Sequence, residues 1–154
     1  MKLTLDNIIN HIRNREYMTG LDRDNSRIRA YGEIFTPTDL VQELLDDLPQ
    51  EIFSKPDEKF IDPAGCGDGQ ILGEILIRKV ENGIDFETAL STIYGVDVQE
   101  SNVLACRERL LCGQEHLRKI VETNIVHADC DTYDFSFNGT NKNDEALQFE
   151  LLFD

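Results

Sequence analysis

Three glycines at alternate positions could bring the backbone of this chain close to a bound ligand. Gly65, Gly67 and Gly69 lie between a predicted strand and a predicted helix. Glycine has no Cβ, so the chain can turn tightly there and a ligand can approach the backbone. No Gly-Lys-Ser/Thr sequence follows these glycines, which excludes a P-loop nucleotide site. A tight turn that binds no ligand is the alternative interpretation.

Acidic residues stand at the ends of three predicted strands, at Asp62, Asp97 and Asp129. Asp97 could accept hydrogen bonds from both ribose hydroxyls of a nucleoside, and Asp129 could accept one from an adenine amino group. Asp62 and Asp68 would repel a pyrophosphate, which disfavours a dinucleotide. The same carboxylates suit S-adenosylmethionine, which carries a sulfonium and an ammonium group. Taken singly, Asp97 is about as well explained as an exposed strand-end carboxylate, and Asp129 would more often be a loop cap.

Strands and helices must alternate along the chain to position these residues. Short apolar runs predict strands over residues 59–62, 92–98 and 125–128, with a strand-like segment over 147–153. Apolar residues at helical spacing predict helices over 3–18, 37–48, 71–80, 86–90 and 100–112. Thr36 is the expected N-cap of the second helix, with Pro37 as its first residue. This alternation is typical of a parallel α/β sheet, where ligands bind at the carboxyl ends of the strands.

Four motifs, in this order, resemble those of the S-adenosylmethionine-dependent DNA N6-adenine methyltransferases, including restriction-modification subunits. Residues 32–37, Gly-Glu-Ile-Phe-Thr-Pro, are similar to the family's N-terminal Gly-x-Tyr/Phe-x-Thr-Pro motif. Residues 60–72 resemble its Asp-Pro-Ala-Cys-Gly-x-Gly-x-Phe-Leu motif. Residues 94–97 and 127–129 resemble its second and third acidic motifs.

The resemblance implies a fold and a division of the chain. The expected fold is α/β, a truncated Rossmann-like class I methyltransferase sheet with flanking helices and an N-terminal helix. An N-terminal helix and loop would occupy residues 1–30. An S-adenosylmethionine-binding domain that lacks the catalytic half would occupy residues 31–154.

The resemblance also implies which residues bind the cofactor. The methionine end would be covered by Phe35, Thr36 and Pro37. Its amino and carboxylate groups would be held by the glycine turn, at Asp62, Pro63, Ala64, Gly65, Cys66 and Gly67. Asp97 would bind the ribose, Val98 would pack on the adenine ring, and Asp129 would accept from the adenine amino group. No catalytic residue and no metal ligand is expected.

The sequence departs from the family in two places. Four residues separate Asp62 from Gly67, where the family commonly has three, which leaves the role of Cys66 open. The family's chemistry depends on an Asn/Asp/Ser-Pro-Pro-Tyr/Phe motif that holds the target amine and stacks on the flipped base. This chain contains no Pro-Pro. A non-catalytic S-adenosylmethionine-binding protein that acts through a partner is therefore expected. The alternatives are the cofactor-binding half of a split methyltransferase and an acidic DNA-mimic or anti-restriction protein.

The composition indicates which partners and which cellular compartment are expected. Among 154 residues, 30 are acidic and 15 basic, a net charge of −15 that disfavours direct binding to DNA. Four cysteines without a Cys-x-x-Cys pair favour a reduced, cytoplasmic protein of a bacterial or phage-infected cell. No apolar run is long enough to span a membrane. An exposed strand over 147–153 predicts a homodimer or a complex with a second protein chain.

Overall fold

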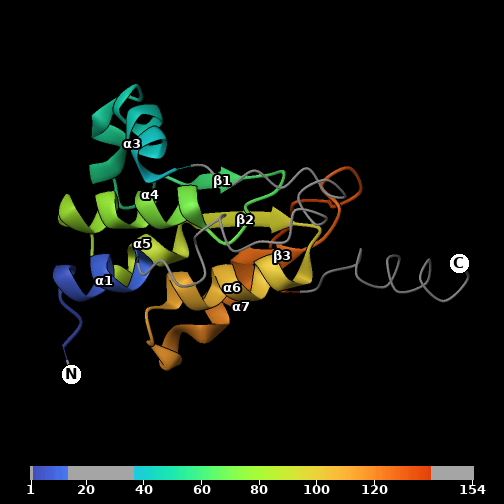
Figure 1. Cartoon of the computed structure of the whole chain (residues 1–154). Helices are drawn as coiled ribbons and strands as arrows, with labels where there is room; N and C mark the ends of the chain where they lie inside the picture. The colour runs from blue at the N-terminus through green and yellow to red at the C-terminus, as the bar shows by residue number, and fades with distance from the viewer. Residues whose placement is uncertain (1, 14–36, 140–154) are drawn as a thin grey trace, which may run out of the picture.

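A computed structural model describes residues 2–13 and 37–139 of the chain (Figure 1). Within these residues β1 (Phe60–Asp62), β2 (Ile93–Asp97) and β3 (Ile125–His127) form a parallel sheet in the order β1-β2-β3. The predicted α/β class with a parallel sheet is confirmed. The small sheet is compatible with a truncated Rossmann-like fold.

Helices connect and flank the strands, close to the predicted ranges. The α-helices are α1 (Leu5–Ile12), α3 (Thr38–Asp46), α4 (Gln70–Glu81), α5 (Phe86–Ser91), α6 (Glu100–Leu111) and α7 (Arg118–Asn124). Two 3-10 helices, η2 (Gln50–Ser54) and η3 (Glu115–Leu117), precede β1 and α7. The helix α7 was not predicted.

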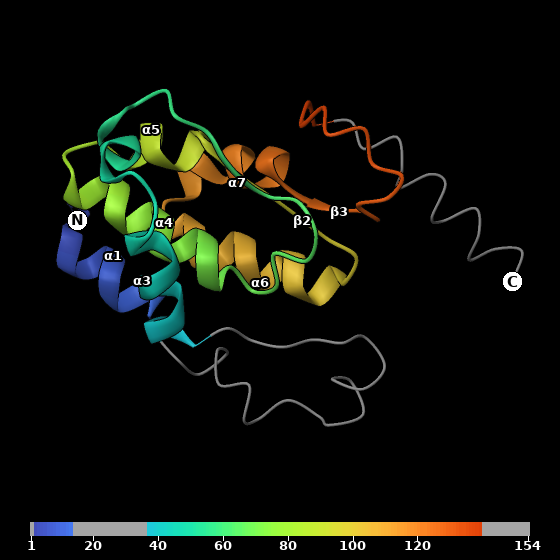
Figure 2. The ribbon, with the colours of Figure 1, turned by 90° about the horizontal axis from the view of Figure 1, so that it is seen from above.

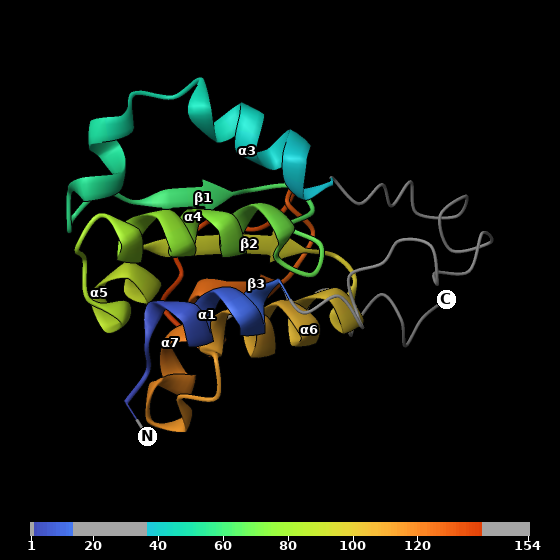
Figure 3. The same cartoon turned by 60° about the vertical axis from the view of Figure 1, so that its left-hand side comes forward.

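The helix α4 is the centre of the packing on one face of the sheet. It lies between α3 and α1 (Figure 3) and also contacts α6, β1 and β2. Its residues 72–77 are all buried, and Leu72 and Leu76 have no exposed surface. Gly73 permits the close approach of α1, since a Cβ built there would lie 2.6 Å from Cγ2 of Ile12.

The opposite face of the sheet is covered by a short aromatic segment. Residues 133–137 lie across the strands from α4 and α6 (Figure 2). Phe137 packs on Tyr94 of β2 with ring centroids 4.8 Å apart, and Tyr133 contacts Phe135 and Phe137. Phe137 belongs to this cluster.

The start of α3 differs from the prediction by one residue. Pro37 is the N-cap and Thr38 the first helical residue, so the assignment of Pro37 to the first helical position is wrong. The extended ψ of 149° at Pro37 places it before the helix. Several predicted features fall outside the described residues: Phe35 and Thr36, the helix beyond residue 13 and the strand over 147–153. None of the helices within 2–13 and 37–139 has the length and apolar character to cross a bilayer.

Candidate functional site

The glycine turn joins β1 to α4 and is fastened to the neighbouring strand. The backbone amides of Gly65 and Cys66 both donate to the carbonyl oxygen of Val96, at 2.9 and 3.1 Å. Gly65, Gly67 and Gly69 all have positive φ, at 94°, 59° and 94°, which L-residues rarely adopt. The sequence prediction of a tight turn that needs glycine is thus confirmed.

Asp97 holds the turn through its side chain. Its Oδ2 accepts a hydrogen bond from the Gly67 amide at 2.9 Å, and its Oδ1 accepts one from the Gln99 amide at 2.7 Å. Asn102 on α6 reaches the same carboxylate at 3.5 Å. The side chain is only 5% exposed, so it sits behind the turn at the end of β2. Asp97 therefore orients the backbone that would meet a ligand.

Asp62 is the last residue of β1 and lies close enough to Asp97 for their charges to interact. Burial, and then the negative charge of Asp97, raise the pKa of Asp62, against a smaller opposing effect of a hydrogen bond from the Ala64 amide. Two carboxylates near one glycine turn make the site strongly electronegative. Such a site favours a ligand group with positive charge and repels phosphate.

Cys66 lies within the turn but points into the protein. Cys66 is 5% exposed. A Cβ built on Gly95 would lie 3.0 Å from both the Cβ and the Sγ of Cys66, so the cysteine packs directly against the glycine. A hydrogen bond with Cys106 and burial raise the pKa of the Cys66 thiol well above its ordinary value. A thiol in this state is not a nucleophile. The structure therefore assigns Cys66 a packing role beneath the turn, and its predicted contact with the cofactor is limited to its backbone.

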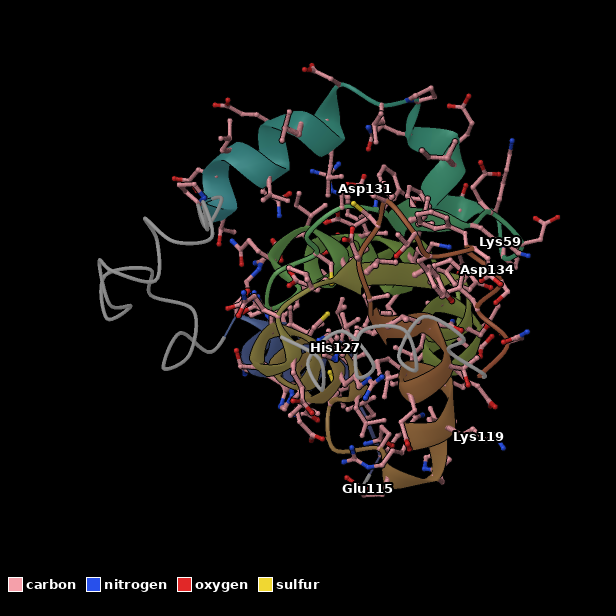
Figure 4. The ribbon with its side chains drawn as sticks, turned by 90° about the vertical axis from the view of Figure 1, so that its right-hand side faces the viewer. Lys59, Glu115, Lys119, His127, Asp131 and Asp134 are labelled. Atoms are coloured by element: carbon pink, nitrogen blue, oxygen red, sulfur yellow. The ribbon has the colours of Figure 1, made fainter. Side chains whose placement is uncertain are left out.

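Val98 and Asp129 extend the site along the strand ends. The view from the carboxyl ends of the strands shows His127 at the end of β3 and Asp131 in the segment that follows (Figure 4). The Ala128 amide donates to the Asp97 carbonyl oxygen at 3.0 Å, so Asp129 comes directly after a residue tied to Asp97. Val98 is 52% exposed and available to pack on a ring.

Asp129 already has a local role. Its Oδ1 accepts a hydrogen bond from the Asp131 amide at 2.9 Å, the loop-cap alternative considered for this residue. A carboxylate oxygen can accept more than one hydrogen bond, so this cap leaves acceptor capacity for an adenine amino group. Asp129 stays a predicted cofactor contact.

Asp68 does not face the site as expected. It is 1% exposed and pairs with Arg109 of α6, with its Oδ1 3.2 Å from Nη1. A buried carboxylate requires such a partner, and this one comes from a residue 41 positions away. Sequence spacing gave no signal for that pair.

Two cavities lie elsewhere on the described surface. One of about 800 Å³ lies beside β3 between α6 and α7, and includes Arg107, Lys119 and His127. Another of about 460 Å³ lies over β1 and β2, against Ile61, Tyr94 and Phe135. Neither is lined by the glycine turn.

Comparisons with protein-family models, curated proteins and solved structures gave no match to this chain.

Proposed function

We propose that this chain binds S-adenosylmethionine at the carboxyl ends of β1 and β2. The observation that carries the proposal is the arrangement around Asp97. A glycine turn with three positive φ angles is fastened to β2, and the carboxylates of Asp62 and Asp97 flank it. In parallel α/β sheets this is the position where nucleoside ligands bind. The resemblance of the four motifs to adenine methyltransferases supports the same ligand.

Binding should be tested by titrating S-adenosylmethionine and S-adenosylhomocysteine into the purified chain by calorimetry. Asp97→Ala should weaken binding by about 1.5–3 kcal/mol, or about 10- to 150-fold, because hydrogen bonds to a charged group are lost. Glu43→Ala is the control, since it removes one exposed acid of α3 away from the turn. Unchanged affinity of Asp97→Ala would remove that residue from the site, and no binding by the parent chain would refute the proposal.

We propose further that the 154 residues do not methylate DNA adenine by themselves. They contain no Pro-Pro motif to hold an exocyclic amine and to stack on a flipped base. With labelled S-adenosylmethionine and double-stranded DNA, incorporation should stay at the level of a heat-denatured control. Incorporation well above that level would contradict this.

The surface around β1 supports action through a second chain. Among the described residues β1 pairs on one side only, with β2. Ile61 is 50% exposed there and Phe135 is 40% exposed, beside the cavity of about 460 Å³. We propose that a second copy of the chain covers this surface with its residues 147–153. A different protein partner, which would make the chain the cofactor-binding half of a split methyltransferase, is the other outcome of the test given in the Discussion.

A further inference from the structure

One buried guanidinium lies directly beneath the glycine turn. Arg109 on α6 is 1% exposed. Its Nη1 donates to Oδ1 of Asp68 in the turn at 3.2 Å, and its Nη2 donates to Oε1 of Gln70, the first residue of α4, at 2.7 Å. Its Nε donates to the carbonyl oxygen of Ile12 at the end of α1, at 2.7 Å. The guanidinium of Arg109 is therefore hydrogen-bonded to the turn, to α4 and to α1 at once.

The network continues to the start of α3. Nε2 of Gln70 donates to Oγ1 of Thr38 at 2.8 Å. Ile12 and Thr38 flank residues 14–36, which include Phe35 and Thr36 of the predicted site. Arg109 thus connects the turn to both described ends that flank this segment.

This arrangement fixes the conformation of the turn more than it stabilises the fold. A buried ion pair contributes little stability compared with apolar packing, because both charges lose their hydration. Asp68 lies between Gly67, whose amide donates to Asp97, and Gly69, the N-cap of α4. Arg109 holds Asp68 inward, and the neighbouring Gly67 amide donates to Asp97, so both bonds fix the same stretch of the turn. Gly69 is held against α6 as well, since a Cβ built there would lie 2.9 Å from Sγ of Cys106.

We propose that Arg109 is a positioning residue for the cofactor site: it holds the glycine turn in its ligand-binding conformation and couples it to α1 and α3. This inference rests on the proposed function, because the ligand is taken to be S-adenosylmethionine. Arg109 does not touch that ligand and acts through Asp68 and Gln70. Lysine cannot replace it, since an ammonium lacks the planar fork that reaches three acceptors.

The test compares two identical substitutions in the full chain, Arg109→Lys and Arg78→Lys. Arg78 also joins elements through its guanidinium, to Asp46 at 2.6 Å and Gln50 at 3.1 Å, but far along α4 from the turn. Both variants should lower the melting temperature. Arg109→Lys should raise the Kd for S-adenosylmethionine about tenfold, as expected for loss of an orienting contact. Arg78→Lys should leave the Kd within about twofold of the parent.

Hydrogen exchange measured without ligand gives a second readout. The peptide covering residues 63–69 should exchange faster in Arg109→Lys than in the parent or in Arg78→Lys. If Arg109→Lys does not fold, Gln70→Ala takes its place, because Gln70 is half-buried and supplies one acceptor of the same guanidinium. It should raise both the Kd and the exchange rate of the turn, by a smaller factor.

The outcomes separate this inference from the proposed function. Equal Kd and equal exchange in a folded Arg109 or Gln70 variant and in Arg78→Lys would overturn the role of Arg109 while cofactor binding stands. No binding by the parent chain would overturn the proposed function. The exchange measurement alone would then decide whether Arg109 holds the turn.

Discussion

At the scale of single residues, the proposed binding of S-adenosylmethionine should depend on pH through Asp62. Burial and the charge of Asp97 raise the pKa of Asp62. In the free protein Asp62 therefore stays protonated at pH values somewhat above 3.8, the ordinary pKa of aspartate. A ligand with sulfonium and ammonium groups favours the ionised carboxylate. Binding should therefore release a proton, and affinity should rise with pH from about 4 upward until Asp62 is ionised in the free protein.

Calorimetry over this pH range, in buffers of different ionisation enthalpy, measures both effects. Asp62→Asn should bind more weakly and should lose most of the pH dependence. S-adenosylhomocysteine, which lacks the sulfonium charge, should show a smaller pH dependence than S-adenosylmethionine. The same pH slope in Asp62→Asn and in the parent would assign the proton to another group.

The raised pKa also affects the stability of the free protein, in the opposite direction. The folded state binds this proton more tightly than the unfolded state. The contribution of Asp62 to the free energy of unfolding therefore falls as pH rises from 3.8 through its folded pKa. Cofactor bound as proposed would offset this loss, because it would favour the ionised form.

At the scale of elements, the contact between α1 and α4 depends on the missing side chain of Gly73. In an exposed helix interior, Gly→Ala stabilises by about 1 kcal/mol. Here the new Cβ would lie 2.6 Å from Ile12, so Gly73→Ala should destabilise the protein by about 1–3 kcal/mol. Urea unfolding measures the change.

A double-mutant cycle tests the cause. Ile12→Ala removes the Cγ2 atom that the new methyl group would meet, so Gly73→Ala should cost less in that background. If Gly73→Ala lowers the free energy of unfolding equally with and without Ile12→Ala, the clash with Ile12 is not the cause of the destabilisation.

The elements were predictable from sequence where local pattern determines them. Periodic apolar residues predicted the bounds of α4 and α6 to within about one residue, and the glycines predicted the turn before α4. The pairing of Asp68 with Arg109 was not predictable, because the two residues lie 41 positions apart and only the fold brings them together. The aromatic cluster around Tyr133 was missed, although Tyr133, Phe135 and Phe137 alternate with polar residues at the strand period. Of the candidate site, the turn and its acids could be foreseen, but not the guanidinium beneath it.

At the scale of the whole molecule, the surface over β1 predicts self-association. Exposed Ile61 and Phe135 lie beside β1, which is an edge strand among the described residues, and such a surface invites pairing with another chain. The full chain should be a dimer by light scattering at micromolar concentration, and a shortened chain that ends at Thr140 should be a monomer. Ile61→Asp should also give a monomer, since it places a charge in the proposed interface.

The results would discriminate between partners. A full chain that is monomeric at this concentration, and no less soluble than the shortened one, would refute pairing through residues 147–153. A poorly soluble full chain that becomes monodisperse only with a second protein would favour the heteromeric complex.

The hydrogen bond from Arg109 to the Ile12 carbonyl sets an order of events during synthesis. The two residues are 97 positions apart, so α1 is made early and its partner on α6 much later. At about 5–20 residues per second, this interval is about 5–20 s. During this time Ile8 and Ile12, both buried in the finished protein, have no α6 to pack against. The packing of α1, which also contacts α4, is therefore completed only after α6 has been synthesised.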